Sequence, residues 1–74
     1  VPGDPIIAPS ALKHGVGEED ILHAIETLYG LDLGDGFTMM IGPNQAAIIL
    51  EVGYVEGVEA VVIVHAMRAR EKFL

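Results

Sequence analysis

The chain has 74 residues, of which 51% are hydrophobic, and its eleven acidic and four basic residues give a formal net charge of −7. This length allows one small domain, and the acidic balance argues against broad nucleic-acid binding because it repels phosphate. The absence of cysteine excludes disulfides and thiolate metal sites and fits a reducing cytoplasm. No apolar run approaches the roughly 18 residues that span a bilayer, so we expect a cytoplasmic protein with no membrane segment.

Residues 1–9 contain three prolines, each of which restricts the backbone and lacks a hydrogen-bond donor. We therefore expect an extended N-terminal arm, in which residues 6–8 either pair as a short edge strand or simply pack. The remaining residues, 10–74, are expected to form a single domain. Ser10 is a suitable N-cap for a short first helix through residue 14, which Gly15 then ends.

A second helix is expected over residues 18–29. Acidic residues 18–20 occupy its first turn, where the helix dipole favours negative charge. The apolar residues Ile21, Ile25 and Leu28 follow at helical spacing and form one stripe. This stripe predicts that the helix packs on a sheet.

After this helix the pattern changes to that of strands. Residues 31–33 and 37–41 flank the turn sequence Gly34-Asp35-Gly36, which is typical of a β-hairpin. Two longer apolar strands follow, over residues 46–55 and 60–67. Short turns between successive strands favour antiparallel pairing. The predicted fold is therefore α+β, with two N-terminal helices packed on a four-stranded antiparallel β-meander.

The two long strands do not alternate cleanly. Residues 48–50 and 61–64 place apolar side chains on both faces of the predicted sheet. The helices can cover only one face, and a chain of this length supplies no second layer. We therefore expect a homodimer formed through the sheet. Gly53, inside the third strand, indicates a possible bulge.

The basic residues are concentrated near the C-terminus, where three of the four lie at positions 68, 70 and 72. Cleavage of RNA without a metal needs a proton acceptor, a proton donor and a cation for the charge that develops on the phosphate. Our candidate catalytic residues, which supply these chemical types, are Glu51, His65, Arg68 and Arg70.

Each candidate also has a structural interpretation. Glu51 interrupts an apolar strand and is either on the solvent face or paired, and His65 can be a buried, hydrogen-bonded histidine. The two arginines can clamp a phosphate or carboxylate, or they can neutralise nearby acids. The three histidines are too widely spaced for a local metal motif, so we expect no metal and no cofactor.

Four short motifs occur in an order that matches a known family: Lys-His-Gly-Val at 13–16, Ile-Gly at 41–42, Leu-Glu-Val at 50–52, and residues 63–71. Over roughly residues 10–73 the chain resembles the BrnT-type toxins of bacterial type II toxin–antitoxin systems, within the RelE-like ribonuclease superfamily. The resemblance implies a RelE-like fold, a metal-independent ribonuclease that cuts messenger RNA, and neutralisation by a small antitoxin protein.

The resemblance also implies roles for individual residues. Lys13 and His14 match the Lys-His pair of the family, and Lys72 matches the end of its pattern, so these three are expected to bind the substrate. The chain departs from the family at His65-Ala66-Met67, where the family tends to have Ser-Ala-Arg, and in its acidic charge.

Two functional hypotheses follow. In the first, the protein is the toxin component of a type II toxin–antitoxin system and a metal-independent mRNA endoribonuclease, with RNA as substrate and an antitoxin as partner. The order of the motifs favours this hypothesis. In the alternative, the protein is a catalytically silent, dimeric protein-interaction domain of the same fold, which the acidic charge favours.

Overall fold

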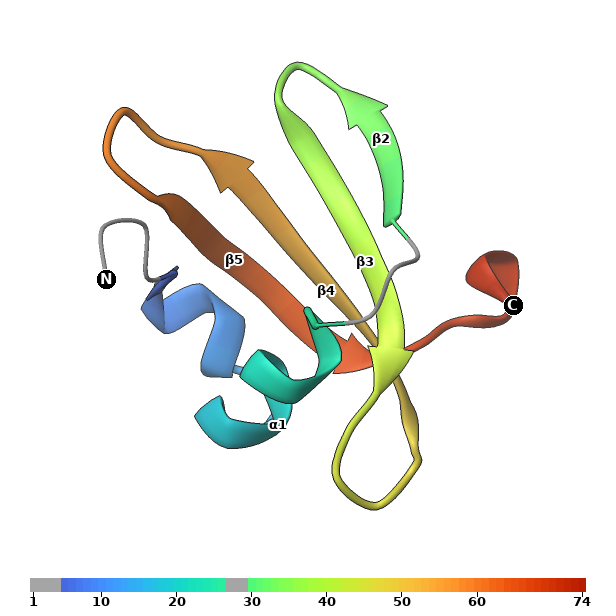
Figure 1. The fold of residues 1–74 in the computed structure, drawn as a ribbon. Helices are drawn as coiled ribbons and strands as arrows, with labels where there is room; N and C mark the ends of the chain where they lie inside the picture. Colours follow the sequence, from blue (N-terminus) through green and yellow to red (C-terminus); the bar gives the residue numbers. More distant parts are fainter. Residues whose placement is uncertain (1–4, 27–29) are drawn as a thin grey trace.

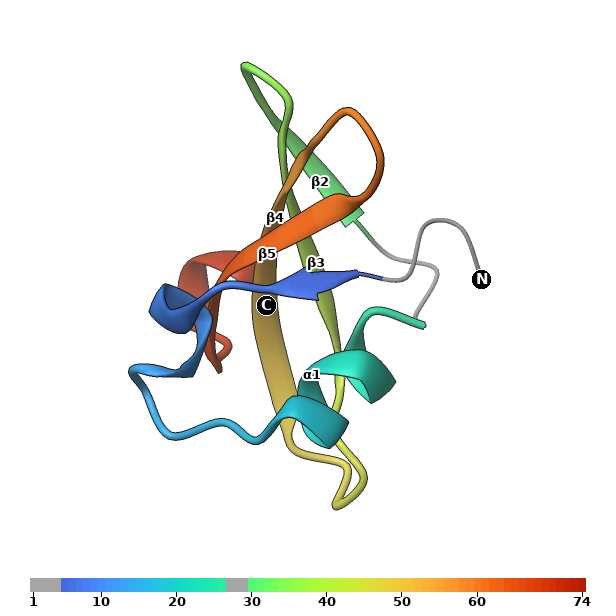
Figure 2. The same ribbon diagram turned by 90° about the vertical axis from the view of Figure 1, so that its left-hand side faces the viewer.

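The structure is a computed structural model that describes residues 5–26 and 30–74. Its elements in chain order are β1 (Ile6–Ile7), the 3-10 helix η1 (Pro9–Leu12), α1 (Glu18–Ala24), β2 (Gly30–Gly34), β3 (Phe37–Pro43), β4 (Ile49–Glu56), β5 (Val61–Arg68) and the 3-10 helix η2 (Glu71–Phe73). Figure 1 shows α1 and η2 on opposite sides of the sheet, and Figure 2 gives the view onto the α1 side. No helix of these described residues is long and apolar enough to cross a membrane.

In the described residues, five strands form one mixed sheet in the order β1-β5-β4-β3-β2. The strands β2 to β5 are sequential antiparallel neighbours, joined by short turns. The strand β1 lies parallel to β5 at the sheet edge, with Ile6 opposite Val62 and Ile7 opposite Ile63. A parallel pair needs a long connection between its strands, and here most of the chain forms that connection.

The predicted fold of two helices on a four-stranded antiparallel meander is wrong. The described residues contain one α-helix, and the expected first helix is the 3-10 helix η1. Ser10 is not its N-cap: the Ser10 hydroxyl instead donates to the carbonyl oxygen of Val64 at 2.8 Å. Residues 6–7 add a fifth strand because the prolines that flank them favour extended backbone, which can pair with the free edge of β5.

The helix α1 begins at Glu18, as the acidic residues predicted, but it is shorter than expected. Its first turn carries all three acids of residues 18–20, next to the positive end of the helix dipole. The helix ends at Ala24 with Ile25 as its C-cap, and residues 27–29 of the predicted helix lie outside the described part of the chain.

Between the sheet and the elements α1 and η1 lies the main hydrophobic core. Its buried residues are Ala11, Ile21, Ala24, Leu50, Val52, Ile63 and Ala66. The three alanines let both helical segments approach the strands closely. Full burial of Ile21 contributes about 1.5–3 kcal/mol.

A bulge in β5 turns His65 away from this core. Tyr54 pairs with Ile63 but Gly53 pairs with His65, so Val64 is an extra residue in β5. Side chains alternate between faces, so without the extra residue His65 would share the face of Ile63. With it, His65 lies on the face opposite α1, the face to which Glu51 also belongs.

Gly53 makes room for two side chains on that face. A Cβ atom at Gly53 would lie 2.7 Å from Cζ of Phe37 and 3.3 Å from Cβ of His65. We therefore expect Gly53→Ala to lower the free energy of unfolding by about 1–3 kcal/mol, measured by urea denaturation. Gly17→Ala is the control because a Cβ there meets nothing within 4 Å. Equal effects of the two substitutions would contradict this account of Gly53.

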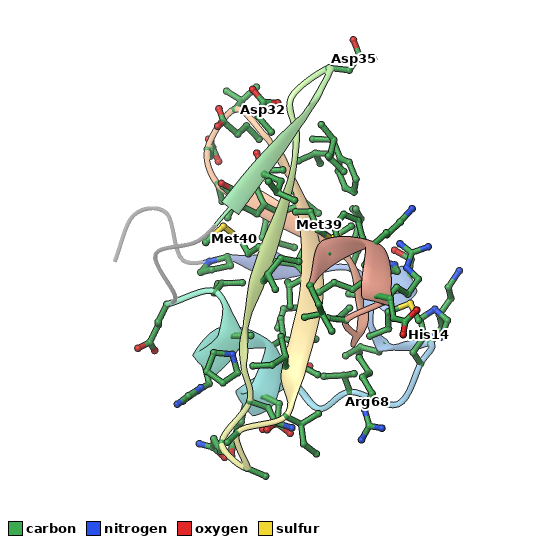
Figure 3. All side chains as sticks on the ribbon, turned by 90° about the vertical axis from the view of Figure 1, so that its right-hand side faces the viewer. His14, Asp32, Asp35, Met39, Met40 and Arg68 are labelled. Atoms are coloured by element: carbon green, nitrogen blue, oxygen red, sulfur yellow. The ribbon has the colours of Figure 1, made fainter. Side chains whose placement is uncertain are left out.

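The C-terminal tail, residues 69–74, covers part of the face opposite α1. The backbone N–H of Ala69 donates to the carbonyl oxygen of Ile49 at 3.0 Å, and η2 then lies on that side of the sheet (Figure 1). Figure 3 shows Met39 and Met40 on opposite sides of β3, with Met39 on the side of the tail. Met39 and Ile41 are buried there, at 3% and 7% exposure. The chain itself thus supplies cover for the second face.

Candidate functional site

The centre of the candidate site is the carboxylate of Glu51, whose side chain is completely buried. Its Oε1 atom accepts hydrogen bonds from the backbone N–H and the Nε of Arg70, each at 2.9 Å. Its Oε2 atom accepts from Nη2 of Arg70 at 2.6 Å and from Nε2 of His65 at 2.7 Å. An acid within an apolar strand is stable only when it is paired in this way. We call Glu51, His65 and Arg70 the Glu51 cluster.

The hydrogen bonds of this cluster control the charge of Glu51. Burial alone would raise the pKa of its carboxyl group, but the hydrogen bonds from Arg70 and His65 and the positive charge of Arg70 outweigh burial. Together they lower the pKa of Glu51 from about 4.5 to about 2. The hydrogen bonds to Glu51 also raise the pKa of Arg70 above its usual value, against a smaller effect of desolvation. Glu51 is therefore an anion that holds His65 and Arg70 rather than a proton acceptor at neutral pH.

His65 is held by Glu51 but remains open to solvent, since 22% of its side chain is exposed. An ionised carboxylate can only accept, so Nε2 of His65 is the nitrogen that donates to Glu51. In the neutral imidazole the other nitrogen, Nδ1, then carries the lone pair. Glu51 thereby selects the tautomer in which Nδ1 of His65 can accept a proton.

A second histidine, His14, lies beside His65. The ring centroids are 5.9 Å apart and the rings meet edge to face, at 77°. His14 follows η1, where the backbone N–H of Gly15 closes the turn on the carbonyl oxygen of Leu12. Gly15 has a φ of 80°, which glycine adopts without strain and which lets the chain turn after His14. Figure 3 shows His14 on the side of the molecule where the C-terminal tail lies.

Three cationic side chains belong to the two segments that lie next to these histidines in the sequence, residues 13–14 and the tail. Lys13 is exposed and precedes His14, and Lys72 is exposed in η2. The Arg70 side chain is 47% exposed, and its Nη1 atom is not among the atoms that bind Glu51. The guanidinium can therefore hold Glu51 with one edge and face a ligand with another.

Arg68 does not join the cluster. It pairs with Leu50, a residue of the core beneath α1, so its side chain belongs to the α1 face of the sheet. Arg70 reaches the other face because the strand ends at Arg68 and the chain turns. Of the four candidate catalytic residues, the fold thus brings together Glu51, His65 and Arg70.

Sequence reasoning missed one residue of the site, Phe73. Its ring lies 5.5 Å from Cζ of Arg70 and 5.1 Å from Nζ of Lys72, both within cation–π distance. The signal that could have found it is the place of this aromatic residue directly after Lys72, three positions from Arg70. The acids Asp32 and Asp35 lie at the β2–β3 hairpin, away from His14 (Figure 3).

Comparisons of the chain with protein-family models, curated proteins and solved structures found no match. Within residues 5–26 and 30–74, no three His, Cys, Asp or Glu side chains are grouped so that they could hold a metal ion. The assignment of a function therefore depends on the geometry of the Glu51 cluster and on the sequence.

Proposed function

We propose that this protein is the toxin component of a type II toxin–antitoxin system and cleaves messenger RNA without a metal. The observation that supports this proposal is the convergence of three segments of the chain: His14 lies beside His65, and His65 and Arg70 both bond to Glu51. The convergence supplies a proton acceptor, a proton donor and a cation, which are the groups that metal-free cleavage of a phosphodiester requires.

Each residue of the site has a role in the proposed reaction. His65 accepts the proton of the ribose 2′-hydroxyl at its Nδ1 atom, and Glu51 holds the ring in the necessary tautomer. The 2′-oxygen then bonds to phosphorus while the bond from phosphorus to the 5′-oxygen breaks. Arg70 stabilises the charge on the non-bridging oxygens. Lys13 and Lys72 hold flanking phosphates, and Arg68, on the other face, has no part in the chemical step.

The charge distribution supports the same location. A net charge of −7 repels RNA from most of the surface, so RNA needs a local region where positive charges gather. Arg70 and Lys72 gather on the ring of Phe73, and Lys13 directly precedes His14.

The test is expression of the chain from a tightly controlled promoter in bacteria, with growth and the integrity of bulk messenger RNA as readouts. The unchanged chain should arrest growth and degrade messenger RNA. His65→Gln keeps an amide N–H that can donate to Glu51 but removes the proton acceptor. We expect it to abolish the arrest and slow cleavage about 100-fold or more.

The matched control is His23→Gln. His23 is an exposed histidine of α1, and its Nδ1 donates to the carbonyl oxygen of Pro43 at 2.8 Å, outside the site. This variant should remain toxic. Folding of both variants is checked by circular dichroism. A folded parent chain that leaves growth and messenger RNA intact would overturn the proposed function.

A second candidate function is a catalytically silent protein-interaction domain. It is favoured by the complete burial of Glu51, because the same hydrogen bonds also fasten the tail over the sheet. Under this proposal His65→Gln and the parent chain are equally harmless. A homodimer through the sheet and an antitoxin partner stay predictions of the respective proposals. Light scattering of the purified chain tests the homodimer, and rescue of growth by a co-expressed neighbouring reading frame tests the antitoxin.

A further inference from the structure

We propose that His14 is the general acid of the cleavage reaction and acts as the partner of His65. This inference rests on the proposed function, but it assigns to His14 a chemical step rather than substrate binding. It starts from the contact between the two rings, which come from residues 51 positions apart in the sequence and from opposite ends of the domain.

The geometry suits two proton transfers at one phosphodiester. A proton donor or acceptor must lie about 2.6–3.2 Å from the oxygen that it serves. Two imidazoles with centroids 5.9 Å apart can each reach a different oxygen of one scissile linkage. One ring alone cannot serve both oxygens at once, because the attacking and the leaving oxygen lie on opposite sides of phosphorus.

The different surroundings of the two rings decide which one is the acid. His65 has Nε2 bound to the Glu51 carboxylate, which stabilises the positive charge that forms when Nδ1 accepts a proton. His14 is exposed and lies against the ring of His65. His14 is thus the ring that can carry a proton to a leaving group that departs toward solvent.

The reaction then balances without another reactant. His65 takes the 2′-hydroxyl proton as the bond between the 2′-oxygen and phosphorus forms. His14 gives its proton to the 5′-oxygen as that oxygen leaves phosphorus. The products are a 2′,3′-cyclic phosphate on one fragment and a 5′-hydroxyl on the other. Water then returns a proton to His14 and removes one from His65, which restores the site.

The first experiment measures the pH dependence of cleavage of a short RNA oligonucleotide by the purified chain. Glu51 from β4 bonds to His65, and Arg70 from the tail bonds to the same carboxylate; both keep their charge between about pH 5 and 8. We expect a bell-shaped profile, because the base must be neutral and the acid protonated. His14→Gln should cleave about 100-fold more slowly and lose the alkaline limb of the profile, while His65→Gln should lose the acidic limb.

The second experiment replaces the leaving 5′-oxygen of the oligonucleotide by sulfur, which leaves without being protonated. This substrate should restore most of the activity of His14→Gln and little of that of His65→Gln. A purely structural role for His14 would leave the variant equally slow on both substrates. His23→Gln serves as the control and should behave as the parent chain on each.

The outcomes separate this inference from the proposed function. If the parent chain cleaves no RNA, the proposed function and the role of His14 both fail. If the parent cleaves RNA but His14→Gln keeps its rate and its alkaline limb, the role of His14 alone is overturned. The same holds if the sulfur-containing substrate fails to restore the activity of His14→Gln.

Discussion

Replacement of Glu51 by alanine is expected to lower the free energy of unfolding by about 3–5 kcal/mol. The substitution removes the acceptor for the backbone and guanidinium of Arg70 and for Nε2 of His65, and it leaves a cavity under the tail. A domain of this size has little stability to lose, so the midpoint of thermal unfolding should fall by more than about 10 °C. Differential scanning calorimetry measures this change.

Two further variants show whether the pairing with the tail causes the loss. Arg70→Ala should also destabilise the fold, because it leaves the buried carboxylate with His65 as its remaining side-chain partner. The double variant should lose much less stability than the sum of the losses in Glu51→Ala and Arg70→Ala. Each of these substitutions already removes the same interaction between Glu51 and Arg70. Arg68→Ala is the control, since this exposed arginine lies on the other face. Additive losses, or an equal loss in Arg68→Ala, would contradict the role of the Glu51 cluster.

The second large effect is a loss of stability in acid. The carboxyl group of Glu51 has a pKa of about 2 in the folded chain and about 4.5 without its partners. The folded chain therefore binds fewer protons at this group, so its contribution is complete above about pH 5. It is lost progressively as the pH falls toward 2. A shift of this size corresponds to about 3 kcal/mol of stability.

Urea denaturation at a series of pH values between about 2 and 7 measures this contribution, with Glu51→Gln as the comparison. Glutamine cannot ionise, so the variant should be less stable than the parent near neutral pH. For the same reason, its free energy of unfolding should fall less than that of the parent as the pH is lowered. The difference between the two stability curves should shrink as the pH falls. Parallel curves over the whole range would show that the Glu51 carboxylate is not the group responsible.

Some features of the candidate site could be predicted from the sequence because they depend on residue type. Glu51 in an apolar run had to be paired or exposed, and His65 and Arg70 were grouped with it on chemical grounds. The structure joins all three and excludes Arg68 from the cluster. The difference arises because the strand ends at Arg68 and the chain then turns, so Arg70 does not continue the alternation of faces.

Other features of the site depend on pairing between distant segments and could not be predicted from local pattern. The extra residue Val64 turns His65 to the face of Glu51, and a shift of one residue would have placed it in the core. The contact between His14 and His65 depends on the path of η1 along β5. The expected dimer was inferred from an uncovered second face, but the tail covers part of that face.

The parts of the fold that could be predicted from the sequence are those that depend on residues close together in the sequence. The turn Gly34-Asp35-Gly36 is an example, because all three residues have positive φ and Gly and Asp accept such conformations easily. The start of α1 at its three acids is another. By contrast, the parallel pairing of β1, the bulge at Val64 and the closure of the tail over Glu51 were settled by tertiary packing. In each case the arrangement is stabilised by contacts with residues that are far away in the sequence. The local sequence of these segments is compatible with other backbone arrangements as well.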